Sequence, residues 1–221
     1  MSGPLNQQVG DDSSLAATIK FALHNFSMTQ ESCLPAVVVS YDHVKNLAVV
    51  RPLIMMTLRT AVGGVETRKR QSIPDVPVLS LGAGKFHIHF PVSEGDLGWL
   101  VASDRDISGF MESLKDNPAT TQRFHSLADG IFIPDMFRNY SLQQEDVGAM
   151  VIQSTDGNTR VSIRSDNIKV TTTSNVTLDC PETHITGHVT VDGDAEIGGI
   201  SFLSHVHGGV IPGGGNTLIP K

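Results

Sequence analysis

From about Glu145 onward the chain has almost no aromatic residues, and this limits what that part can fold into. The whole chain has nine phenylalanines, two tyrosines and one tryptophan, yet only Phe202 lies beyond Tyr140. The apolar residues there come in i, i+2 pairs, which indicate short strands with one buried face each. The pairs are Val161 and Ile163, Ile168 and Val170, Val176 and Leu178, and Val189 and Val191.

Strands of this kind bury too little surface to be stable in a single chain. Burial yields about 25 cal/mol per Å² of apolar surface, whereas ordering the backbone costs about 1–2 kcal/mol per residue. A lone chain would also expose long strand edges. Three copies wound around one axis would bury the apolar pairs and give every edge a partner. We therefore expect an intertwined trimeric β-helix over residues 145–203, with a monomeric β-solenoid as the alternative.

The first part of the chain has the pattern of a helix followed by a small β-barrel. Ser13 or Ser14 can cap a helix in which apolar residues recur at helical spacing, namely Leu15, Ile19, Ala22 and Phe26. Short strands separated by turns follow Pro35, and a second helical stretch, DISGFMESLK, comes after them. Five short strands fit a closed barrel of the oligonucleotide/oligosaccharide-binding (OB) type. The expected strands cover residues 36–42, 47–59, 75–81, 85–91 and 97–103.

These patterns predict a mainly β protein in which an N-terminal OB-type barrel precedes the trimeric β-helix, which ends in a metal-bound tip. The expected parts are an N-terminal arm and helix over residues 1–33, the barrel over 34–116, an irregular connector over 117–144, the β-helical prism over 145–203 and the tip over 204–221.

The tip is expected to bind a metal through His205 and His207, in the stretch SHVHGGV. Residues i and i+2 of a strand point to the same face, so the two imidazoles project together. A threefold axis turns one pair into six imidazoles. Six nitrogen ligands in an octahedron do not suit zinc but suit Fe(II), Ni(II) or Co(II), of which we favour iron on cellular availability. A site with all six positions filled would be structural and would join three chains.

A second histidine pair serves as a comparison. In KFHIHF, Phe86, Ile88 and Phe90 are expected to form the apolar face of a barrel strand. His87 and His89 would then lie on the opposite, wet face. We expect them to be surface histidines rather than metal ligands.

Composition argues against several classes of function. The net charge of −7 and the scarcity of aromatic residues do not favour nucleic-acid binding. No apolar run approaches the roughly 18 residues of a transmembrane helix, and the N-terminus lacks the pattern of a signal peptide, so we expect synthesis in the cytoplasm. Cys33 and Cys180 are expected to be reduced. No common catalytic motif is present, so we expect no enzymatic activity.

Four barrel segments and the His-X-His-Gly-Gly motif together resemble the membrane-piercing central spike proteins of contractile-tailed bacteriophages, the baseplate assembly protein V type. The segments are LPAVVVSYD, VVRPLI, IPDVPVL and FPVSEGDLGWLVASDRDI, and the resemblance covers Leu34 to Gly209. It implies a homotrimer whose tip holds an iron ion through His205 and His207 of each chain. It also implies a place in the virion, at the baseplate tip of the tail.

The same resemblance implies contacts with tail tube or hub and baseplate proteins, and with the host outer membrane, which the spike pierces when the sheath contracts. Synthesis would take place in the host cytoplasm. Two departures stand out. The chain continues 14 residues beyond His207, and it carries no lysozyme-like or peptidase-like insertion.

The sequence thus predicts a structural central spike with an iron-bound tip. Two alternatives stay open. One is an OB-fold module that binds an oligosaccharide or a nucleic acid. The other is a His-ligated metalloenzyme such as an oxygenase, which needs an open coordination position and a nearby carboxylate; the closest acidic residue in sequence is Glu196.

Overall fold

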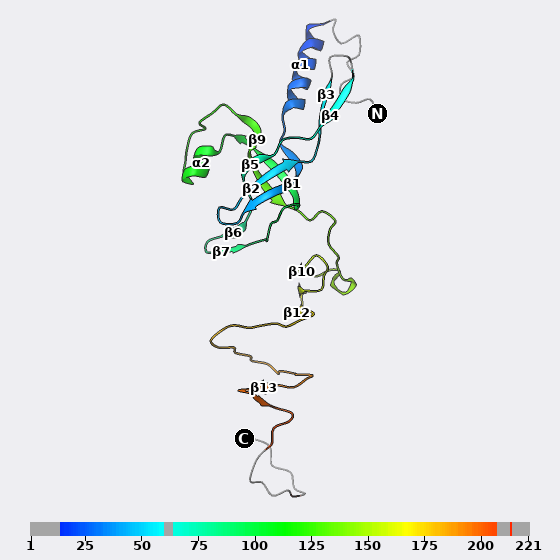
Figure 1. The fold of residues 1–221 in the computed structure, drawn as a ribbon, viewed down its shortest axis with the longest axis vertical. Coiled ribbons are helices and arrows are strands. Elements are labelled where there is room, and N and C mark those ends of the chain that lie inside the picture. The colour runs from blue at the N-terminus through cyan, green and yellow to red at the C-terminus, as the bar shows by residue number, and fades with distance from the viewer. Residues whose placement is uncertain (1–13, 60–63, 207–212, 214–221) are drawn as a thin grey trace. The chain divides into compact units, whose positions relative to one another are not determined.

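The computed structural model of the protein describes residues 14–59, 64–206 and 213 (Figure 1). The chain divides into two compact units, Met1–Thr173 and Ser174–Lys221. The regular secondary structure of the described residues is mainly β-strand, with few helices. None of the helices in these ranges is long and apolar enough to cross a membrane.

The helix expected near the N-terminus is present as α1 (Leu15–Thr29). It begins after Ser14, whose hydroxyl accepts a 3.1 Å hydrogen bond from the Ala17 N–H group. This bond satisfies one of the N–H groups that have no partner inside the first turn of a helix. The helix ends at Thr29, and the backbone becomes extended at Gln30. The first 13 residues of the expected N-terminal arm lie outside the described residues.

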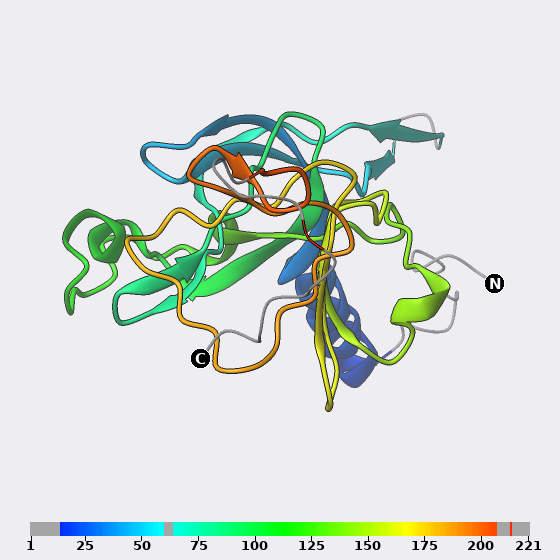
Figure 2. The same ribbon diagram turned by 90° about the horizontal axis from the view of Figure 1, so that it is seen from below.

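Five antiparallel strands form a nearly closed, barrel-like sheet in the order β5-β2-β1-β8-β9 (Figure 2). The two edges approach each other through a parallel bridge between Val78 and Phe132, and the Leu79 N–H group donates a 2.8 Å hydrogen bond to the Phe132 carbonyl oxygen. This closure leaves little of the sheet edge exposed. The strands are β1 (Cys33–Asp42), β2 (Leu47–Pro52), β5 (Ile73–Pro77), β8 (Leu97–Arg105) and β9 (Phe124–Pro134).

The barrel encloses one core of small aliphatic side chains around a single buried aromatic ring, that of Phe132. Its members alternate along the strands, as expected where one face of each strand points inward. The buried core residues are Ala36, Val38, Ala48, Val50, Val76, Val78, Leu100, Leu127 and Phe132.

The composition of the barrel corrects two expectations. Residues 117–144 were expected to be an irregular connector, but they contain β9, the fifth barrel strand, so the barrel extends beyond residue 116 to Pro134. The expected strand over residues 85–91 is instead the short β7 (Phe86–Ile88), which pairs only with β6 (Leu81–Ala83).

The sequences of β9 and of the stretch KFHIHF explain why both expectations were wrong. The buried residues of β9 include Asp129 and Gly130 beside Leu127 and Phe132, so its apolar alternation is interrupted. The stretch KFHIHF alternates well, yet Phe86 is 86% exposed because no barrel strand covers it. Alternation alone therefore did not identify the strand that the core needs.

Three smaller elements complete the barrel unit. The expected strand over residues 47–59 ends at Pro52, which has no N–H group to donate. The chain then forms a hairpin of β3 (Met56–Arg59) and β4 (Val65–Arg68). The expected second helix is present as the short α2 (Ser108–Ser113).

The chain beyond the barrel forms two small antiparallel sheets. The short 3-10 helix η2 (Gln144–Asp146) precedes a sheet of β10 (Met150–Gln153), β11 (Arg160–Ile163) and β12 (Ile168–Thr171). Further on, β13 (Glu196–Ile197) and β14 (Ile200–Ser201) form a hairpin. Its turn needs two residues with positive φ, which Gly198 and Gly199 supply at 58° and 81°. The single chain shows neither the expected intertwined β-helix nor the metal-bound tip, over the residues that are described.

Candidate functional site

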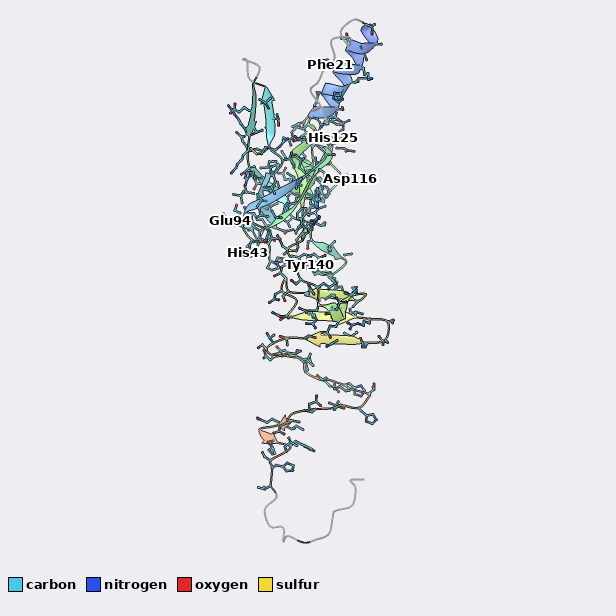
Figure 3. All side chains as sticks on the ribbon, turned by 90° about the vertical axis from the view of Figure 1, so that its right-hand side faces the viewer. Phe21, His43, Glu94, Asp116, His125 and Tyr140 are labelled. Atoms are coloured by element: carbon cyan, nitrogen blue, oxygen red, sulfur yellow. The ribbon has the colours of Figure 1, made fainter. Side chains whose placement is uncertain are left out.

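One face of the β10–β12 sheet consists entirely of aliphatic side chains, which we call the aliphatic face. Residues that lie opposite each other in an antiparallel pair point to the same side of the sheet. Figure 3 shows the three strands side by side, and their register therefore builds two apolar rows. The first row is Met150, Ile163 and Ile168, and the second is Ile152, Val161 and Val170.

The aliphatic face is uncovered in the single chain. Its four side chains on the outer strands, Met150, Ile152, Ile168 and Val170, are 54–68% exposed. An exposed and contiguous apolar patch of this kind marks a surface that binds another molecule. The period-two pattern of Val161 with Ile163 and of Ile168 with Val170 correctly predicted that each strand has one apolar face.

The opposite face of the same sheet is covered by an ion-pair cluster, which we call the Asp146 cluster. Asp146 in η2 is fully buried, and its carboxylate faces two cations of the β11 region. Its Oδ2 atom lies 2.6 Å from Nε of Arg160, and its Oδ1 atom accepts a 2.9 Å hydrogen bond from Nη2 of Arg164. Arg160 also pairs with Glu145, which in turn lies 3.0 Å from Nζ of Lys169. The cluster thus joins η2 to both β11 and β12.

Electrostatics in this cluster favours the ionised carboxylate. The hydroxyl of Ser162 first, and then the guanidinium groups of Arg160 and Arg164, hold the pKa of Asp146 below its ordinary value of 3.8, although burial opposes this shift. Lys169 first, and then Arg160, likewise lower the pKa of Glu145. Ion pairs within the chain therefore cover one face of the sheet, whereas nothing in the single chain covers the aliphatic face.

The segment that follows the sheet is extended and carries further exposed apolar side chains. The described structure contains no strand between β12 and β13, over residues 172–195. Its apolar residues are 53–73% exposed, and these are Val176, Leu178, Ile185, Val189 and Val191. The β13–β14 hairpin continues the pattern, with Ile197 and Ile200 also exposed. This segment presents apolar side chains at the spacing of strands but has no sheet within its own chain.

Of the two proposed metal ligands, the structure describes only His205. Its Nδ1 atom lies 2.9 Å from the Phe202 carbonyl oxygen and 3.2 Å from that of Ser201. A hydrogen on Nδ1 can bond to these carbonyls, and this tautomer places the lone pair on Nε2. Metal-binding histidines are commonly oriented in this way by a backbone carbonyl.

His207, Gly208 and Gly209 lie outside the described residues, so the structure does not test the proposed histidine pair. In the part of the chain that is described, no group of three or more His, Cys, Asp or Glu side chains could hold a metal ion. Cys33 and Cys180 are both exposed and form no disulfide.

A shallow cavity of about 430 Å³ lies on the barrel unit and bears on the binding-module alternative. Its polar lining includes Arg70 and Glu31, and Nη1 of Arg70 donates a 2.8 Å hydrogen bond to the Glu31 carboxylate. These opposite charges offset each other. No Phe, Tyr or Trp is among the described residues that line the cavity, and the imidazole of His125 is the one ring in that lining, so the cavity offers little surface on which a base or sugar could stack.

A second buried ion-pair cluster stabilises the barrel. Asp106, after β8, and Asp129, in β9, are both nearly inaccessible to solvent. Nη2 of Arg123 lies 2.8 Å from Oδ1 of each carboxylate. Asp106 also accepts hydrogen bonds of 2.6 Å from the Ser108 hydroxyl and 2.7 Å from the Thr120 hydroxyl. The cluster ties both ends of the α2 segment to the barrel.

Asp106 also caps the start of α2, which is only part of its role. Its carboxylate does accept a 3.0 Å bond from the Ser108 N–H group at the start of α2. Its partner Arg123 lies 17 residues further on and gives no local sequence signal. The hydrogen bonds from the side chain and backbone of Ser108, followed by that from Thr120, hold the pKa of Asp106 far below its ordinary value of 3.8.

Replacing Asp106 with asparagine is expected to lower the Tm of the barrel by about 5–10 °C at neutral pH. Because the folded-state pKa is depressed, the contribution of the ionised carboxylate is complete above pH 3.8 and is lost as the pH falls further. The Tm difference between the two proteins should therefore shrink in acid. Circular dichroism melts at pH 7, 5 and 3 test this, with the exposed Asp116→Asn as the control. A difference that does not change with pH contradicts the assignment.

Comparison with known proteins agrees with a barrel that includes β9. Residues 34–135 match the family model described as phage protein Gp138 N-terminal domain. No curated protein matches the chain. The family match covers less than half of the chain, from the second residue of β1 to just beyond β9. It supports a phage protein with a structural role, associated with the virion.

Proposed function

We propose that this protein is the central spike at the distal end of a contractile phage tail, a non-enzymatic homotrimer that pierces the host outer membrane when the sheath contracts. The observation that carries the proposal is the aliphatic face of the β10–β12 sheet, with its six residues and no cover in the single chain. Three such faces around one axis would bury one another. The phage family match of residues 34–135 supports the setting.

The extended segment after β12 adds a second argument. Its exposed side chains alternate as in strands, so strands of neighbouring copies would pair with its backbone and bury these residues. A trimeric β-helix in which every strand bonds to another chain would be stiff, as a piercing device requires. The Asp146 cluster would remain on the outer side, because it occupies the face opposite the aliphatic one.

The barrel has a different role in this proposal. Its five antiparallel strands, with the parallel contact between Val78 and Phe132, fit the partly open OB type. Three barrels would attach the spike to tail tube or hub and baseplate proteins.

The proposed tip holds iron through His205 and His207 of three chains. The fit rests on His205, because its Nδ1 atom lies at two backbone carbonyls and this orients Nε2 as the ligand atom. The ion would supply a structural link between chains and no catalysis. Its binding energy would add to the stability of the trimer.

The mass of the purified full-length protein in solution, measured together with its metal content, tests the proposal. We expect three chains per particle and one iron per three chains. The variant with His205→Ala and His207→Ala should keep the trimer and lose the iron. A monomeric particle would overturn the spike. A trimer that binds zinc, or binds no metal after exposure to Fe(II), would overturn only the iron tip.

A further inference from the structure

A stripe of apolar side chains runs along α1, the helix that precedes the barrel in the sequence. Leu15, Ile19 and Leu23 are 50–77% exposed, which is unusual for large aliphatic residues of a 15-residue helix. A helix of this length is only marginally stable in water without a packing partner. The stripe therefore needs a cover that the barrel unit does not provide.

The spacing of the stripe is that of a coiled coil. Leu15, Ile19, Ala22 and Phe26 follow one another at intervals of four, three and four residues, which places them at alternating d and a positions of a heptad. Leu23 lies at the adjoining e position and widens the apolar surface. A stripe that includes e positions suits a bundle of more than two helices better than a narrow two-helix seam. Phe21, labelled in Figure 3, lies at a c position outside the stripe.

The charges of α1 indicate which molecule covers the stripe. In coiled coils that pair with a different protein, charged residues at the e and g positions usually determine which partner is bound. In α1 these positions hold Ala16, Thr18, Leu23 and Asn25, and none of them is ionised. Lys20, the one Lys or Arg of the helix, lies at a b position, away from the stripe. An uncharged stripe of this kind is complementary to itself and does not repel another copy.

We propose that α1 forms a parallel three-helix coil with the α1 helices of two other copies of this chain. This inference rests on the proposed trimer, which would hold three copies of the helix at a high local concentration. The coil would join the chains ahead of the barrels, at a point separate from the aliphatic face. It would also fix the threefold axis at the end of the chain that attaches to the tail.

Disulfide trapping tests this contact in the full-length protein. The exposed Cys33 and Cys180 are first changed to serine, and Ile19→Cys is then compared with Ala17→Cys. Residue 19 lies on the stripe, and residue 17 lies at an f position on the opposite side of the helix. After mild oxidation we expect the Ile19→Cys protein to form disulfide-linked pairs of chains at least about tenfold faster than the Ala17→Cys protein.

The mass of the particle before oxidation separates the two proposals. A trimeric particle in which Ile19→Cys and Ala17→Cys cross-link at equal rates, or not at all, overturns the coil and leaves the spike intact. A monomeric particle that does not cross-link overturns both. A second comparison uses Ile19→Asp and Ala17→Asp. Circular dichroism should show a loss of helix only in Ile19→Asp, and an equal loss in both variants would again overturn the coil.

Discussion

Replacing both Ile152 and Val170 with aspartate is expected to convert the particle from a trimer into single chains. The two residues lie in the same row of the aliphatic face, on the outer strands β10 and β12. In a trimer the double variant would bring six carboxylates together in an apolar interface, where an unpaired charge is strongly unfavourable. In the single chain both side chains are exposed, so the variant sheet can still form. Light scattering after size-exclusion chromatography measures the change in mass.

The control lies on the same strand and the opposite face. Lys169→Gln removes one of the two cationic partners of Glu145, at the exposed edge of the Asp146 cluster, and exposed ion pairs contribute little to stability. This variant should remain trimeric. The barrel of the double aspartate variant should still melt as in the unmodified protein, because its core shares no residue with the aliphatic face. The proposed α1 coil is a separate contact between the chains, so the same measurement is repeated with Ile19→Asp added. A particle that is still trimeric would show that the aliphatic face does not hold the chains together.

The part of the fold that depends on short-range alternation could be predicted from the sequence. The pairs of Val161 with Ile163 and of Ile168 with Val170 predicted one apolar face per strand, and the register of β11 and β12 confirms it. The helical spacing from Leu15 onward predicted α1 correctly. In both cases the signal lies within one turn or one strand, so neighbouring residues carry it.

The features that depend on distant residues were missed. The barrel strand β9 buries Asp129 and Gly130, and the buried carboxylate of Asp129 is stabilised by its ion pair with Arg123. The Asp146 cluster likewise joins residues 14 and 18 positions apart. No periodicity reports such pairs. The proposed iron site remains a prediction, since His207 lies outside the described residues.

Replacing Asp146 with alanine is expected to open the β10–β12 sheet. The carboxylate is fully buried between Arg160 and Arg164, so its removal leaves both guanidinium groups without their shared anion. Removing one partner of a buried ion pair lowers the stability of the fold much more than replacing the whole pair with apolar residues, because the remaining charge stays buried without a counter-charge. Amide hydrogen exchange over residues 150–171 should accelerate by roughly tenfold or more, while exchange in the barrel strands stays unchanged.

Asp166→Ala is the matched control, because Asp166 is an exposed aspartate in the turn between β11 and β12 of the same sheet. Its exchange pattern should match that of the unmodified protein. The depressed pKa of Asp146 also predicts a pH dependence. The ionised carboxylate stabilises the folded sheet above pH 3.8, and this stabilisation declines in stronger acid. The unmodified protein should therefore approach the exchange behaviour of Asp146→Ala at low pH. Equal exchange in Asp146→Ala and Asp166→Ala at neutral pH would mean that the cover supplied by other chains, and not the Asp146 cluster, holds the three strands in register.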